Sequence, residues 1–215
     1  MRAMCNLYRL TKPAAAIASL FRAELAGAPN HAAEVYPGYP GLVVAQGEVR
    51  AMNWGFPLAQ MSRRTGLPLK PRPVNNARED KLLTGFWADS FRRRRCLIPV
   101  SAWAEAEGPR GAMTRTWHAL PHAEVFAVAG LWRMTAEWGP AYAMVMVDGC
   151  AQMAEVHDRM PTILAPADWQ RWTDGTPEEA LALCRVHDGP LAIDRTTQAW
   201  FQWGLETQRT AAKLL

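Results

Sequence analysis

The sequence predicts an α+β fold with a curved, largely antiparallel β core and flanking helices. Segments with strand character lie mostly in the middle of the chain, and helical segments lie mainly near its two ends. This segregation favours an α+β fold over alternating βαβ units. The chain has 215 residues, 49% of them hydrophobic, which suffices for one sizeable core or at most two small ones. We expect a single domain over residues 1–215.

Helices are predicted from signals at their ends. A first helix is expected over Pro13–Ala26, because a proline begins it, apolar residues recur on one face and a glycine follows it. A short helix is expected over Ala167–Thr173. Another is expected over Thr176–Val186, where Thr176 and Glu179 have the spacing of a capping box.

Strands are predicted where apolar, β-branched and aromatic residues gather between turn residues. Residues 41–54 are expected to form a hairpin, in which Leu42–Ala45 and Val49–Trp54 flank a turn near Gly47. Further strands are expected over Arg95–Val100, Thr116–Leu120, Val125–Trp132 and Ala141–Val147.

Composition excludes several classes of protein. No apolar run approaches the roughly 20 residues of a membrane-spanning helix, and the N-terminus lacks a signal-peptide pattern, so we expect a cytoplasmic protein without membrane contact. The cysteines are widely spaced, which argues against a disulfide framework and a structural zinc site; we expect no metal and no cofactor. They are Cys5, Cys96, Cys150 and Cys184.

Positive charge is concentrated in residues 50–115, which hold 13 Lys and Arg against 5 Asp and Glu, a net charge of +8. Basic grooves with aromatic platforms suit single-stranded nucleic acid, although a solubilising surface would carry the same charge. The aromatic residues in and beside this segment that could serve as platforms are Trp54, Phe56, Phe86, Trp87, Phe91 and Trp103.

Cys5 follows Met4, so a chain started at Met4 and stripped of that methionine would begin with Cys5. An N-terminal cysteine carries both an α-amine and a thiol. The pKa values of these two groups are close enough to neutral pH that part of each is in its nucleophilic, deprotonated form. Such a 1,2-aminothiol condenses with an aldehyde to an imine and then a thiazolidine. We therefore expect residues 1–4 to be absent from the active form. The alternative is a small buried cysteine in the first strand.

Other polar positions are also candidates for chemistry. Asn75 and Asn76 offer amides and Arg78 offers a phosphate fork, although a plain loop would also use turn-forming asparagines. Glu105 lies five residues beyond a predicted strand among apolar neighbours, which suits an acid or base with a raised pKa, or else it is a surface glutamate. His157 lies among polar residues and is either a proton shuttle or structural.

These segments together resemble the SOS-response-associated peptidase (SRAP) domain over about residues 4–205. Five segments occur in the family's order, and they are Met4–Tyr8, Asn76–Glu79, Arg95–Pro99 with Glu105 beyond it, Ala129–Trp132 and His157–Pro161.

The resemblance implies a monomeric, single-domain SRAP fold with a barrel-like β core. It implies an abasic-site processing protein that binds single-stranded DNA containing abasic sites and forms a thiazolidine crosslink. A peptidase activity limited to the leading methionine is implied, and a lyase-type activity is allowed. Carried over by position, Cys5 is the nucleophile, Asn76 orients the amine and the sugar, Glu105 is the acid and base of imine formation, and His157 assists ring opening and reversal.

For DNA binding, the resemblance implies that Arg78 and Arg159 hold phosphates and that Trp54 packs near the DNA path. The sequence departs from the family before Glu105. The common segment Ala-Asp-Gly-Phe/Trp-Tyr-Glu-Trp is replaced here by Val100–Ala106, so two aromatic residues beside the glutamate are alanines.

Two other functions are compatible with these residues. A cysteine hydrolase of the N-terminal-nucleophile or papain-like type, acting on peptides, would use Cys5 and His157 as its pair. A passive binder of single-stranded DNA would need only the basic segment. An adduct with abasic DNA that survives denaturation distinguishes the first function from both alternatives.

Overall fold

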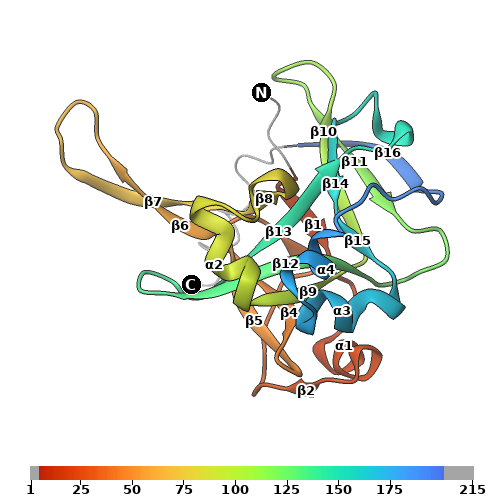
Figure 1. The fold of residues 1–215 in the computed structure, drawn as a ribbon. Coiled ribbons are helices and arrows are strands. Elements are labelled where there is room, and N and C mark those ends of the chain that lie inside the picture. Colours follow the sequence, from red (N-terminus) through yellow and green to blue (C-terminus); the bar gives the residue numbers. More distant parts are fainter. Residues whose placement is uncertain (1–4, 201–215) are drawn as a thin grey trace, which may run out of the picture.

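The computed structural model describes residues 5–200, and these form the α+β fold that the sequence predicts (Figure 1). The helices are α1 Ala14–Phe21, α2 Gly85–Arg93, α3 Trp169–Asp174 and α4 Pro177–Leu181. The strands are β1 Leu7–Arg9, β2 Glu24–Leu25, β3 Glu34–Val35, β4 Pro40–Ala45, β5 Glu48–Trp54, β6 Phe56–Met61, β7 Pro68–Val74, β8 Asn76–Arg78, β9 Arg95–Val100, β10 Ala102–Glu107, β11 Thr114–Ala119, β12 Phe126–Thr135, β13 Gly139–Asp148, β14 Arg159–Pro161, β15 Ile163–Leu164 and β16 Ala192–Ala199.

Five strands close into a barrel. β13, β12, β9, β4 and β5 are antiparallel neighbours in that order, and β5 then pairs in parallel with β13. In this closing pair, Tyr142 lies opposite Trp54. All residues of β9 are buried, as are Ala141–Val147 in β13, because the barrel surrounds its own core. The predicted barrel-like core is confirmed.

A second sheet, in the order β16-β11-β10-β1-β3, packs beside the barrel. It is joined to the barrel through a tyrosine pair, because the hydroxyl groups of Tyr8 in β1 and Tyr142 in β13 lie 2.5 Å apart. The pair fits only beside a glycine, since a Cβ at Gly41 would lie 2.1 Å from the Tyr8 hydroxyl. The start of β1 is therefore held against the barrel.

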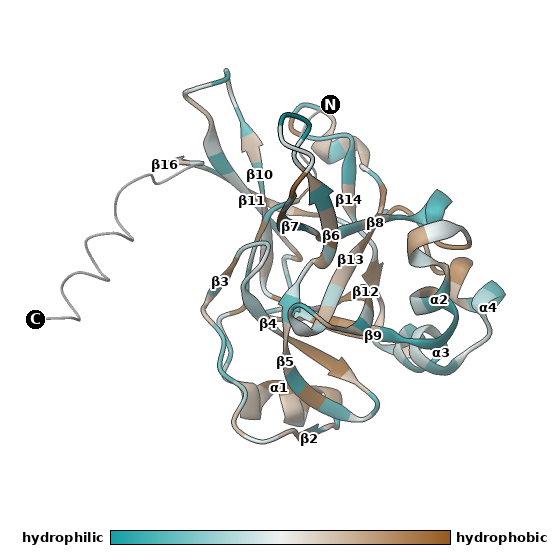
Figure 2. Cartoon of the chain, turned by 90° about the vertical axis from the view of Figure 1, so that its left-hand side faces the viewer, coloured by the Kyte–Doolittle hydropathy of each residue, from teal (hydrophilic) through white to brown (hydrophobic). Residues whose placement is uncertain are grey.

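The helices are shorter than predicted, and three of them group on one side of the barrel (Figure 2). The helix predicted over Pro13–Ala26 ends at Phe21, because Arg22 is left-handed with φ 51° and the next residues join the edge of β5. The helix predicted over Thr176–Val186 ends at Leu181, although its capping box is present. No helix within residues 5–200 is long and apolar enough to cross a membrane.

Strands β6 and β7 form a hairpin arm that projects from the barrel (Figure 1). Neither this arm nor α2 is predicted from the sequence. The predicted strand Arg95–Val100 ends where β9 ends, and Glu105 lies in a further strand, β10, that is not predicted. Because β10 and β11 pair closely, with Glu105 opposite Thr116, the glutamate is fixed within a sheet and not in a loop.

Candidate active site

Cys5 is fully buried immediately before β1, and two side-chain amides hold its backbone. Its carbonyl oxygen accepts hydrogen bonds from Asn75 Nδ2 at 3.0 Å and Asn76 Nδ2 at 2.7 Å. The thiol donates to the Leu7 carbonyl at 3.6 Å. Asn75 also donates to Asn6 Oδ1 at 3.2 Å. The structure thus places Asn76 beside Cys5, as the resemblance implies. It also places Asn75 there, which the resemblance did not name. The position of Asn75 next to Asn76 in the sequence could have indicated this contact.

The asparagine doublet is held by the barrel. Strand β8 runs parallel to β13 with Asn76 opposite Met144, and the Met144 amide donates to the Asn75 carbonyl at 2.8 Å. The Trp54 indole donates to the same carbonyl at 3.1 Å. Trp54 is fully buried, so its ring is not exposed as a face on which a base could stack. Its indole hydrogen bond instead fixes Asn75, which in turn holds Cys5.

Glu105 is 1% exposed, so a surface glutamate is excluded. Its Oε1 has no hydrogen-bond partner among the described residues. Burial raises the pKa of Glu105 well above its ordinary value, and the nearby charge of Asp158 raises it further. Burial also raises the pKa of the Cys5 thiol, and the charge of Glu105 adds to that rise. The two groups therefore lie within electrostatic reach of one another, and the carboxyl group favours its protonated form.

His157 is buried beside the same region with one nitrogen engaged. His157 Nδ1 lies 3.0 Å from the Arg159 backbone N–H, 3.3 Å from the Arg159 carbonyl oxygen and 3.3 Å from Asp158 Oδ1. Nε2 has no partner among the described residues. The close approach of this loop depends on Gly149, where a Cβ would lie 2.8 Å from the His157 carbonyl oxygen. His157 therefore keeps one ring nitrogen, Nε2, without a partner in the described part of the chain.

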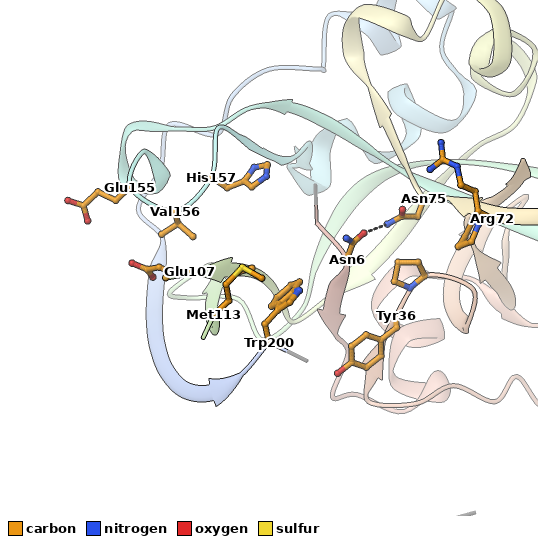
Figure 3. Close-up of a pocket in the computed structure, with 14 residues that line it drawn as sticks. Asn6, Tyr36, Arg72, Asn75, Glu107, Met113, Glu155, Val156, His157 and Trp200 are labelled. Atoms are coloured by element: carbon orange, nitrogen blue, oxygen red, sulfur yellow. Dashed lines mark hydrogen bonds between the residues drawn. The ribbon is translucent and has the colours of Figure 1, made fainter. Parts of the chain in front are cut away.

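A cavity of about 620 Å³ adjoins these groups (Figure 3). Asn6, Asn75 and His157 line it. Cys5 and Glu105 lie behind its wall, where their chain neighbours Asn6 and Ala106 face the space. The structure thus brings all four predicted catalytic residues to one region. Asn76 donates a hydrogen bond to Cys5, and the charge of Glu105 affects the pKa of the Cys5 thiol. His157 lines the cavity that adjoins them.

The two predicted phosphate-binding arginines already have carboxylate partners. Arg78 forms a forked pair with Asp80, with both hydrogen bonds at 3.0 Å. Arg159 contacts Glu79 at 3.2 Å and Asp148 at 3.0 Å. To bind a phosphate, either arginine must release its carboxylate partner or contact the carboxylate and the phosphate together. Among residues 5–200, no group of three potential ligands could hold a metal ion.

The aromatic platforms predicted in the basic segment are mostly absent from the surface. Only Phe86, at 37% exposed, is accessible, because the other rings fill the core. The buried rings are Trp54, Phe56, Trp87, Phe91 and Trp103. Exposed basic side chains of this segment lie on the arm, which is not predicted from the sequence, and also on α2, where Arg92 and Arg93 are exposed.

Glu105→Gln is expected to stabilise the fold at alkaline pH and to have little effect at acid pH. The raised pKa means that folding favours the protonated acid, so this contribution is complete below the unfolded pKa and is lost as pH rises through the folded pKa. A difference of one pKa unit between the folded and the unfolded chain corresponds to about 1.4 kcal/mol, and we expect a gain of at least that order at pH 8. Urea unfolding at pH 4 and pH 8 measures it.

Glu107→Gln is the matched control, because Glu107 lies two residues along the same strand. The hydrogen bond from Thr116 lowers the pKa of Glu107, so its neutralisation should destabilise the fold at pH 8. A gain for Glu105→Gln that is equal at both pH values would contradict the assignment.

The fold resembles solved structures of low sequence identity. A protein from Bacteroides thetaiotaomicron is 17% identical, covers 89% of this chain and 91% of its own, and has a TM-score of 0.71. A Bordetella bronchiseptica protein is 17% identical, covers 89% and 99%, and has a TM-score of 0.75. A phage-related protein of the same organism is 20% identical, covers 90% and 94%, and has a TM-score of 0.66.

No curated protein sequence matches the chain. The family model described as SOS response associated peptidase (SRAP) matches residues 4–203. The chain therefore belongs to the SRAP family, which that description associates with the SOS response.

Proposed function

We propose that this protein captures abasic sites in single-stranded DNA by forming a thiazolidine with Cys5 as its first residue. The observation that carries the proposal is the fixed position of Cys5, whose carbonyl accepts two asparagine amides beside the buried acid Glu105. A residue that reacts through its own backbone amine needs its backbone held in this way. Residues 1–4 lie outside the described residues, and their removal is part of the proposal.

The chemistry follows from the groups around Cys5. The amine adds to the aldehyde carbon of the ring-opened sugar, and the resulting carbinolamine loses water to give an imine. A protonated Glu105 suits donation to the departing hydroxyl. The thiol then adds to the imine carbon while its proton passes to the nitrogen, which closes the ring. In this proposal His157 uses its unpartnered Nε2 to donate a proton to the sugar ring oxygen as the furanose opens.

The geometry favours this reaction over a papain-like hydrolase. Such enzymes lower the pKa of their cysteine through an adjacent histidine. Here burial raises the pKa of the Cys5 thiol, and the thiol donates to the Leu7 carbonyl. No hydrogen bond between Cys5 and His157 occurs among the described residues. A passive DNA binder, in turn, has no use for a buried carboxyl group whose Oε1 lacks a hydrogen-bond partner in the described part of the chain.

The arm supplies the proposed DNA contact outside the reacting residues. Four of its basic side chains are exposed, and none forms an ion pair with another residue in the described part of the chain. They are Arg63, Arg64, Lys70 and Arg72. Arg72 also lines the cavity, so it lies where a strand that leaves the site would pass.

Arg72→Ala is expected to weaken non-covalent DNA binding and to flatten its salt dependence. Each neutralised phosphate of a single strand contributes about −0.7 to the slope of log affinity against log salt concentration. We therefore expect the slope of the Arg72→Ala variant to be smaller in magnitude by about that amount. Arg78→Ala should have a smaller effect, because Asp80 already pairs with Arg78. Fluorescence anisotropy across a salt series measures both slopes.

Arg185→Ala is the matched control for this prediction. Arg185 is exposed and pairs with Asp168 beyond the site, so its removal should leave the slope unchanged. Equal changes for Arg72 and Arg185 would show that only overall charge matters.

The proposed function is tested with a single-stranded oligonucleotide that contains one abasic site. Incubation followed by denaturing electrophoresis should give a slower band that survives heating with detergent. Binding that disappears on denaturation would indicate a passive binder. Turnover of a peptide ester without the slower band would indicate the hydrolase.

A further inference from the structure

The cavity beside the candidate active site has an aromatic wall that the proposed chemistry does not use. Trp200 and Tyr36 line it on the side away from His157 (Figure 3). Asn6, which follows Cys5, lines the same cavity, and so does Arg72 from the arm. A sugar attached to Cys5 would therefore place its neighbouring nucleotide at this space.

Trp200 is the last residue that the structure describes. A backbone hydrogen bond and the packing of its side chain hold it in place. Its amide donates to the Met113 carbonyl at 2.8 Å. Its side chain packs on a small cluster of Leu7, Ala104 and Trp117. The cluster includes Ala104, one of the two positions beside Glu105 where alanine replaces the aromatic residue common in the family. The other, Ala106, lines the cavity.

We propose that this cavity binds the nucleotide next to the captured sugar and that Trp200 is the face on which its base stacks. The inference rests on the proposed function and extends it to a specificity-determining residue. The volume of about 620 Å³ exceeds that of one base, and the small side chain of Ala106 helps to leave it open. Arg72 supplies a cation for the adjoining phosphate, and bases stack on aromatic side chains whatever their sequence.

The test measures equilibrium binding to oligonucleotides that carry an unreactive tetrahydrofuran site. In one set the nucleotides beside the site are normal, and in the others the 5′ or the 3′ neighbour also lacks its base. Trp200→Leu keeps apolar bulk against Leu7 but removes the aromatic face. We expect it to weaken binding to the normal oligonucleotide on the order of tenfold, whereas removal of the base on one side should abolish the difference.

Trp200→Phe should retain most of the affinity, because it keeps an aromatic face. Trp138→Ala, which alters a partly buried tryptophan that does not line the cavity, should behave as wild type. Equal weakening of Trp200→Leu on every oligonucleotide, or no weakening, would overturn the inference. Crosslinking to a reactive abasic site is scored separately, so failure of the proposed function would show as a missing adduct while these affinities still report on Trp200.

Discussion

Cys5→Ala is expected to abolish the denaturation-resistant adduct with abasic DNA completely. Without the thiol the amine still forms an imine, but the ring cannot close and the imine hydrolyses. Non-covalent affinity should stay nearly unchanged, because the thiol is buried and carries no charge. Denaturing electrophoresis with and without borohydride separates the two steps, since borohydride traps the imine of the alanine variant.

Cys184→Ala is the control, because Cys184 is partly exposed whereas the other described cysteines are buried. It should crosslink as wild type does. A form that retains residues 1–4 provides a second arm, because an internal amide nitrogen cannot form an imine. Normal crosslinking by that form, or dependence on Cys96 or Cys150, would refute the aminothiol mechanism.

Glu105→Gln is expected to slow crosslinking by about 10²-fold or more, which is within the usual range of general acid–base catalysis. Glutamine preserves the shape of the side chain but cannot release a proton to the carbinolamine. The measurement is a single-turnover time course at saturating DNA, so that altered affinity does not contribute. His157→Ala should slow ring opening and reversal while leaving binding intact.

The pH profile separates catalysis by Glu105 from a structural effect. In the proposed mechanism Glu105 acts as the protonated acid, so the wild-type rate should lose the contribution of Glu105 as pH rises through its raised pKa. Glu105→Gln should lack this limb, and Glu107→Gln should retain it because the pKa of Glu107 is lowered. Identical profiles for wild type and Glu105→Gln would leave the carboxyl group without a catalytic role.

Local patterns in the sequence predicted much of the fold. The bounds of β9 match the prediction, the hairpin of β4 and β5 lies where its turn residues indicated, and the capping box at Thr176 is present. These features depend on neighbours a few residues apart. The ordered motifs also predicted SRAP membership, which the family match confirms. They named Cys5 and three further residues, Asn76, Glu105 and His157, that the fold brings to the same region.

The sequence by itself therefore determined the fold class and the family, because short-range periodicity and the order of motifs can be read without the fold. The catalytic roles of Cys5, Asn76, Glu105 and His157 stay predictions. Only the tertiary structure decided which side chains face inward. Closure of β5 onto β13 turned Trp54 into the core, and pairing of β10 with β11 buried Glu105 and raised its pKa. Trp200 reached the cavity beside Asn6 because β16 returns along β11. Such contacts join residues that lie far apart in the chain. They form only when the barrel closes and the sheets pair, so no local sequence pattern predicts them.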